Sequence, residues 1–486
     1  MRRILIAASV ALAGVSGAAE GPSRDEAAAA LRRGVAFFRG KVAVEGSYLW
    51  AYSEDLSKRE GEGVARPTVG WVQPPGTPAV GSALLEAWEA TGDRFHLDAA
   101  LETAQALVRG QLASGGWDYS IEFDPARRKK LPYRADGGTA GKNVTTLDDD
   151  TTQAAVRFLL HADRACAFTN EAIHRCVTTA LQSLLAAQYP NGAWPQRFEA
   201  PPDASKFPVK SASYPDAWSR EFPKRDYKAD YTFNDNALAD MIDTMFEASR
   251  VLAGPAADGA AQSLGRACRA AAEKAGGFIL LAQMPDPQPA WAQQYDADMH
   301  PSWARKFEPP SITGSESQGI LRILMRLHGE TGDRRFLEPV PRALAYLRRS
   351  LLPNGQLARF YELRTNTPLY FTKDYRLVYD DGDLPTHYGF KVSSDLDRIA
   401  RQYEHAAGET WKAPAGGPRI PRLDGGTRKA AADAIAAQDA EGRWVEKGGL
   451  KYQEPKDASA RVIRCDTFIR HTRALSRFLA ASKPAP

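Results

Sequence analysis

The heptapeptide QLASGGW at residues 111–117 returns as QYPNGAW at residues 188–194, and this pattern decides the fold. A stretched copy spans residues 283–291, and a fourth copy spans residues 438–444. In each copy a stretch with helical periodicity ends in Gln, a Gly-rich or Pro-rich corner follows, and Trp closes the motif. Copies at such spacing indicate stacked supersecondary units. We therefore predict a mainly α protein built from repeated helical hairpins.

The segments between the corners carry the helical signals. Residues 87–107 place apolar side chains near positions i, i+3 and i+4 of an amphipathic helix. The tripeptides at residues 91–93 and 331–333 both read Thr-Gly-Asp, where Gly ends one helix and Asp caps the next. We expect an α/α toroid, an incomplete barrel of hairpins whose loops build a cleft at one rim. A structural role is favoured over sugar stacking for Trp117, Trp194 and Trp444.

Strand patterns are sparse. The segments Leu357–Tyr361 and Leu369–Val378 predict a short β-hairpin, and two Pro-rich and charged stretches, residues 123–143 and 199–228, predict loops. The organisation that we expect is a signal peptide (1–19), an N-terminal helical region (20–86), a catalytic toroid (87–412), a linker (413–422) and a C-terminal helical unit that closes the toroid (423–486).

The start of the chain predicts export. Arg2 and Arg3 precede an apolar run over residues 4–15, and small residues follow at 16–18, as in a secretory signal peptide. The run is too short to span a bilayer, so we expect a secreted or periplasmic protein with no membrane partner after cleavage. Losing the two arginines leaves 61 of the 63 basic residues against 59 acidic ones. Such a balance excludes a strongly basic nucleic-acid binder, and we expect a monomer.

The four cysteines do not form a metal motif, because no CxxC pair is present. Cys166 and Cys176 are close enough in sequence to form a disulfide bridge. Cys268 and Cys465 are far apart in sequence, and we expect buried free thiols.

Two acidic segments stand at expected loop-to-helix junctions. Asp148, Asp149 and Asp150 are consecutive, and only one carboxylate is needed to cap a helix. Three adjacent carboxylates repel each other, so a bound cation explains them better. Oxygen ligands without a His or Cys set favour Ca²⁺. The second segment, NDN at residues 234–236, is by itself explained as a helix cap.

The stretch WARKFEPPSI at residues 303–312 places cations beside aromatic residues and a Pro-Pro turn. Arg305 is therefore a candidate functional cation, with Lys306 as the alternative. The simpler interpretation of Arg305 is a surface salt bridge to Glu308.

These segments, together with RFYELRTNTP at residues 359–368, resemble the family 10 pectate lyases from about Ala87 to Lys391. The resemblance implies a polysaccharide lyase that cleaves polygalacturonate, an acidic polysaccharide, by Ca²⁺-assisted β-elimination. The residues that it implies are Arg305 as the catalytic base, Asp148, Asp149 and Asp235 as metal ligands, and Lys373, Arg364, Asn366 and Lys391 as substrate-binding groups.

The sequence departs from the family at three positions. Asp149 stands where the family typically has Asn, and Lys373 stands where it usually has Arg, which loses the bidentate fork of the guanidinium. His387 lies where an Arg pair is expected, and Lys391 is the candidate replacement. Two alternatives stay open. One is a toroid glycoside hydrolase acting on an acidic oligosaccharide, with Asp148 and Asp235 as acid and base. The other is a non-catalytic toroid that binds uronides.

Overall fold

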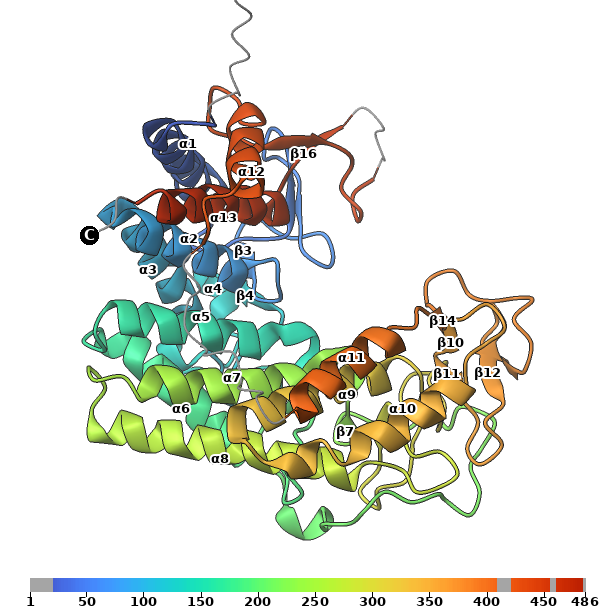
Figure 1. The fold of residues 1–486 in the computed structure, drawn as a ribbon. Coiled ribbons are helices and arrows are strands. Elements are labelled where there is room, and N and C mark those ends of the chain that lie inside the picture. Colours follow the sequence, from blue (N-terminus) through green and yellow to red (C-terminus); the bar gives the residue numbers. More distant parts are fainter. Residues whose placement is uncertain (1–20, 409–420, 455–459, 484–486) are drawn as a thin grey trace, which may run out of the picture.

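The computed structural model describes residues 21–408, 421–454 and 460–483. The expected signal peptide and most of the expected linker lie outside these residues. The long helices form two layers of one arc (Figure 1), which confirms the predicted α/α toroid. The outer layer contains, in spatial order, α12 (Gly425–Ala436), α1 (Arg24–Phe37), α3 (Arg94–Gly110), α6 (Glu171–Ala186), α8 (Gly259–Leu281) and α10 (Pro339–Arg349). The inner layer contains α13 (Cys465–Ala481), α2 (Thr77–Thr91), α5 (Thr151–Ala165), α7 (Ala237–Leu252), α9 (Glu316–Thr331) and α11 (Leu396–Ala407).

The repeated corners fasten the outer helices to one another. Gln111 Nε2 donates to Gly115 O inside its own corner (2.7 Å) and to Cys176 O of the next outer helix, α6 (2.9 Å). The indole N–H of Trp117 donates to Leu107 O at the end of α3 (2.9 Å). The other three corners repeat both features, through Gln188 with Trp194, Gln283 with Trp291, and Gln438 with Trp444. All four indoles are buried, which confirms the structural role over sugar stacking.

The interhelix turns also form as predicted. Gly92 and Gly332 end their helices with φ of 73° and 75°, a left-handed conformation that glycine adopts at little cost. Asp93 and Asp333 then accept hydrogen bonds from backbone N–H groups two residues ahead.

The two ends of the chain meet in one sheet, which the sequence did not predict. The region expected to be helical before residue 87 also contains β1 (Ala51–Ser53), β2 (Arg59–Glu60) and β3 (Val69–Trp71). Strands β15 (Val445–Lys447) and β16 (Arg461–Arg464) join β1 and β2 in the order β15-β16-β1-β2, with all pairs antiparallel. Helices α12 and α13 accordingly pack against α1 and α2.

The predicted hairpin lies within a larger β-rich segment near the other end of the arc. Strands β11 (Phe360–Tyr361) and β12 (Pro368–Phe371) pair antiparallel, which confirms the hairpin. β13 (Leu377–Val378) and β9 (Ile312–Thr313) extend it to the order β13-β12-β11-β9. The remaining pairs are β10 (Leu357–Ala358) with β14 (Lys391–Val392), β3 with β4 (Ser120–Glu122), β5 (Thr145–Thr146) with β6 (Arg197–Phe198), and β7 (Tyr231–Thr232) with β8 (Gln294–Tyr295).

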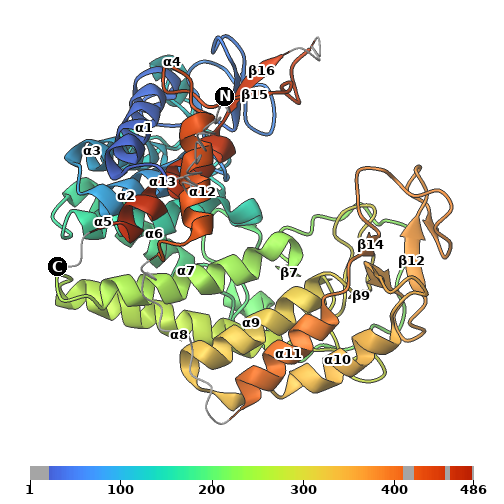
Figure 2. The same ribbon diagram turned by 45° about the horizontal axis from the view of Figure 1, so that its top comes forward.

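The two predicted loop stretches contain only short helical turns, α4 (Pro125–Arg128), η2 (Arg134–Asp136) and η4 (Ala204–Lys206). The sheet that contains β1 and β16 and the segment that contains β11 and β12 project from the same side of the arc (Figures 1 and 2). This side is the rim at which inner helices begin, because short strands such as β5 and β7 lead into α5 and α7.

The four cysteines are free thiols, so Cys166 and Cys176 do not form the bridge that their spacing allowed. Among the described helices, none combines the length and the apolar character that a membrane span requires.

Candidate functional site

Two matching turns hold carboxylates at the rim. In the turn before α5, Asp149 and Asp150 have φ of 50° and 59°. In the turn before α7, Asp235 and Asn236 have φ of 47° and 59°. Left-handed backbone is costly for most residues other than glycine, and least so among these for Asp and Asn, whose short polar side chains tolerate it. The two turns therefore present acidic side chains from adjacent inner helices in the same way.

The turns bring the three expected metal ligands together. Asp148, Asp149 and Asp235 each offer a carboxylate oxygen, and these oxygens lie within 4.8 Å of one another. Burial, with the charges of Asp148 and Asp235, raises the pKa of Asp149 to about 6. Burial also raises the pKa of Asp235, although Arg305 opposes this. Such crowding disfavours the charged carboxylates unless a cation is bound between them.

In each of these carboxylates neighbouring donors engage one oxygen, and no described residue donates a hydrogen bond to the other. The buried Oδ1 of Asp148 has no hydrogen-bond partner within the described part of the chain. An orphaned buried carboxylate oxygen is costly unless an ion or water satisfies it, so these residues fit a hard cation such as Ca²⁺. The donors are Tyr119 Oη (2.8 Å) and Arg197 Nη2 (3.4 Å) for Asp148 Oδ2, Gln73 Nε2 (3.0 Å) for Asp149 Oδ2, and Asn234 Nδ2 (2.7 Å) for Asp235 Oδ2.

Arg305 forms the ion pair with Glu308 that its sequence spacing allowed. Nε and Nη2 of Arg305 donate to the two carboxylate oxygens of Glu308 at 2.8 Å and 2.6 Å. This ion pair is partly buried, because the Glu308 side chain is only 2% exposed and the Arg305 side chain is 39% exposed. Burial lowers the pKa of Arg305, but the hydrogen bonds and charge of Glu308 outweigh this and raise it.

Sequence reasoning missed several side chains that support the site. Tyr388 Oη donates to Glu308 Oε1 (2.9 Å), so this buried carboxylate is shared between Tyr388 and Arg305. Arg359 Nη1 donates to Glu316 Oε1 (3.2 Å) at the start of α9. Arg359 stands in the segment 359–368, but no spacing rule links it to Glu316. Tyr119 and Arg197 likewise lie outside every motif that we used.

The four expected substrate-binding residues make their polar contacts with groups outside the carboxylate cluster. Lys373 pairs with Asp383 (3.0 Å), and Lys391 pairs with Asp381. Arg364 and Asn366 lie in the loop between β11 and β12. Arg364 packs over Tyr214 and donates a hydrogen bond to Pro215 O. Asn366 accepts hydrogen bonds from Tyr346 and Gln288 and donates one to Ser350. Within the described residues, no hydrogen bond or ion pair joins any of the four to Arg305 or to the acidic cluster.

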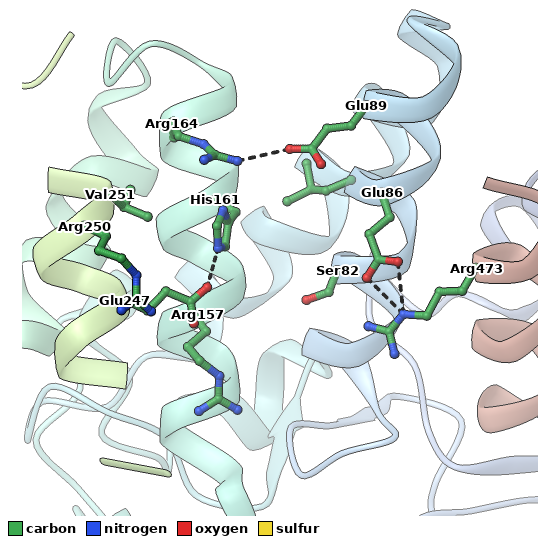
Figure 3. Close-up of a pocket in the computed structure, with 11 residues that line it drawn as sticks. Ser82, Glu86, Glu89, Arg157, His161, Arg164, Glu247, Arg250, Val251 and Arg473 are labelled. Atoms are coloured by element: carbon green, nitrogen blue, oxygen red, sulfur yellow. Dashed lines mark hydrogen bonds and ion pairs between the residues drawn. The ribbon is translucent and has the colours of Figure 1, made fainter. Parts of the chain in front are cut away.

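A separate cavity of about 600 Å³ lies on the inner wall of the arc (Figure 3). Its charges are paired between neighbouring inner helices: Arg164 with Glu89, His161 with Glu247, and Arg473 with Glu86. Arg157, also in its lining, pairs with Asp150 at 2.5 Å. The third aspartate of the DDD run is therefore engaged in an ion pair. Because these charges satisfy each other, we place the functional site at the rim instead.

Asp240 lines the adjoining cavity of about 400 Å³, and the pH dependence of protein stability can test its titration there. Burial and the charge of Asp150 raise its pKa to about 7, above the value of about 3.9 that an unfolded Asp has. The folded state thus holds an extra proton between pH 4 and 7, and stability falls as pH rises through that window. We expect Asp240→Asn to raise the Tm by several degrees at pH 8 and by less at pH 5, measured by thermal denaturation.

Asp397→Asn is the matched control, because the Asp397 side chain on α11 is 85% exposed and does not line this cavity, so its loss should not raise the Tm. An equal shift for Asp240→Asn at both pH values would contradict the raised pKa.

Fold and site together describe a helical toroid enzyme with an oxygen-only carboxylate cluster beside an arginine. The chain belongs to the pectic acid lyase family, whose model matches residues 111–356. Its class is therefore that of the lyases acting on polysaccharides. No curated protein sequence matches the chain.

Solved structures resemble the chain at low identity. A family 10 polysaccharide lyase from Cellvibrio cellulosa is 20% identical, with a TM-score of 0.47, and the match covers 68% of this chain and 98% of that one. That structure is a mutant in complex with trigalacturonic acid. The GH76 α-mannanase BT2949 from Bacteroides thetaiotaomicron is 10% identical, with a TM-score of 0.40, over 94% of this chain and 96% of that one.

Proposed function

We propose that this polysaccharide lyase cleaves polygalacturonate by β-elimination, with Arg305 as the base and Ca²⁺ held by Asp148, Asp149 and Asp235. The observation that carries the proposal is the Asp148 carboxylate, whose Oδ1 is buried without a partner in a cluster electrostatically coupled to Arg305. Asp149, where the family typically has Asn, makes the cluster more negative and suits a divalent cation. We further propose that the protein acts as a secreted or periplasmic monomer.

The reaction needs one proton removed and one bond broken. Arg305 takes the proton from C5 of a galacturonate unit, and the electrons of the C5–H bond form the C4=C5 double bond. The C4–O4 bond breaks, and water supplies the proton that the departing O4 requires. When bound, Ca²⁺ supplies positive charge beside the uronate carboxylate, where negative charge develops in the transition state.

The contacts of Arg305 define how it would act. Its Nε–Nη2 edge is engaged by Glu308, and Nη1 has no hydrogen-bond partner among the described residues, so Nη1 is the nitrogen available to a substrate. Glu308 and Tyr388 hold the guanidinium in place. Because the ion pair raises the pKa of Arg305, the neutral form required of a base is scarce at neutral pH. We therefore expect the rate to rise toward alkaline pH.

The geometry favours the lyase over the hydrolase alternative. A glycoside hydrolase uses two carboxylates, about 5–5.5 Å apart in retaining enzymes and about 6.5–9.5 Å apart in inverting ones. Here one oxygen from each of three carboxylates lies within 4.8 Å of the others, a cluster of like charges that an acid and base pair does not require. A cation between them is the more economical explanation.

The decisive assay follows the ultraviolet absorbance of the unsaturated uronide formed from polygalacturonate. We expect absorbance to rise with added Ca²⁺ and to stop when EGTA removes the ion, because the carboxylates repel each other without it. A magnesium control tests for a general ionic effect. Reducing ends without absorbance would identify a hydrolase, and calcium-dependent binding without turnover would identify a non-catalytic uronide-binding protein.

A further inference from the structure

The side chain of Gln73 connects the N-terminal part of the chain to the carboxylate cluster. Its Nε2 donates to Asp149 Oδ2 at 3.0 Å, and its Oε1 accepts from the indole N–H of Trp71 at 3.1 Å. Since an indole N–H can only donate, the amide oxygen must face Trp71 and the amide nitrogen must face Asp149. The orientation of this amide is thus fixed by the chemistry of its neighbours.

Gln73 is also held at its backbone and shielded from solvent. Its carbonyl oxygen accepts from Trp50 Nε1 at 3.0 Å, and the residue is 6% exposed. Trp50 and Trp71 contact each other edge to face, with ring centroids 6.1 Å apart. Trp50 therefore anchors the backbone of Gln73, and Trp71 holds its side-chain amide in the orientation that donates to Asp149.

The position of Gln73 in the fold explains how it reaches the site. It precedes the inner helix α2, which packs against α5, and Asp149 stands in the turn that begins α5. On the other side of α5, the turn before α7 contributes Asp235. Gln73 lies upstream of residues 111–356, to which the family model matches.

We propose that Gln73 is a positioning residue for the metal ligand Asp149, so that the N-terminal part of the chain completes the calcium site. By occupying Asp149 Oδ2, its amide leaves Oδ1 for the ion and fixes the carboxylate plane. Donors that orient a ligand in this way typically change metal affinity about 10–100-fold when they are removed. This inference rests on the proposed Ca²⁺ site and extends it to a residue outside the matched segment.

The test measures Ca²⁺ binding to the full-length protein by isothermal titration calorimetry, without substrate. Gln73→Met keeps the length of the side chain and removes the donor, and we expect it to raise the Kd for Ca²⁺ at least 10-fold. Gln105→Met is the matched control, since Gln105 lies on α3 and outside the site. Lyase activity of Gln73→Met should recover at high Ca²⁺, because the catalytic base is intact.

A double variant separates positioning from simple destabilisation. If Gln73 acts through Asp149, then Gln73→Met should add little to the loss already caused by Asp149→Ala. A Kd for Gln73→Met within two-fold of the parent, even with a lowered Tm, would overturn the role. If the parent protein did not bind Ca²⁺, the proposed role of Gln73 would also be overturned. The lyase function would still stand if that parent formed unsaturated product without Ca²⁺.

Discussion

Arg305→Ala should lower kcat on polygalacturonate by about 10²–10⁴-fold, the range typical of a lost general base. The KM should change much less, whereas the Tm should fall, because the buried Glu308 loses its guanidinium partner and keeps only the hydrogen bond from Tyr388. Steady-state ultraviolet assays at saturating Ca²⁺ measure the effect. Arg305→Lys should retain part of the rate and shift the pH optimum downward, since Lys gives up its proton more easily than Arg.

The neighbouring lysine is the matched control for Arg305. Lys306 Nζ lies 3.6 Å from the ring centroid of Tyr375, so this side chain is directed to an aromatic surface. Lys306→Ala should therefore leave kcat within a few-fold of the parent. If Arg305→Ala keeps the parental kcat, Arg305 serves only its ion pair with Glu308. If Lys306→Ala alone abolishes the rate, the base has been assigned to the wrong cation.

Asp235→Ala should weaken Ca²⁺ binding on the order of 10²-fold, since ligand charge tunes calcium affinity over several decades. The same substitution should stabilise the calcium-free protein at pH 8. The pKa of Asp149, about 6, lies above its unfolded value, so this group destabilises the fold once pH exceeds about 4, and fully above pH 6. Removing the charge of Asp235 relieves part of that cost.

Calorimetric titration and thermal denaturation in EGTA measure these two opposite effects. Asp397→Ala is the control, because Asp397 is an exposed residue of α11 and its side chain is 85% exposed. Unchanged affinity in Asp235→Ala would remove Asp235 from the ligand set. A lower Tm in EGTA would show that its attraction to Arg305 outweighs the repulsion between the carboxylates.

The repeated corners explain why the architecture was predictable from the sequence. Gln111 and Trp117 act through backbone carbonyls a few residues away or on the next outer helix, so a local motif encodes how neighbouring units join. The acidic residues of the candidate site could be predicted from the sequence for a similar reason. Asp149 and Asp235 stand in equivalent turns before neighbouring inner helices, and each turn is a short, polar sequence signal.

The rest depends on contacts that no local pattern reveals. Gln73 and Tyr119 reach the cluster from separate loops, and both look like ordinary polar residues in the sequence. The sheet at the chain ends was missed because β1 and β16 are only a few residues long and pair across nearly the whole chain. The expected substrate-binding residues came from resemblance alone, and in the structure Lys373 and Lys391 pair with Asp383 and Asp381 of a β-rich segment.

The pairing of β1 with β16 has a consequence for biogenesis. Tyr52 pairs with Ile463, so one strand of the pair is synthesised about 400 residues before the other. Helices α1 and α2 likewise pack against α13, so this N-terminal unit cannot finish packing until α13 has been synthesised. Truncation at the C-terminus should accordingly expose apolar surface at the opposite end of the sequence.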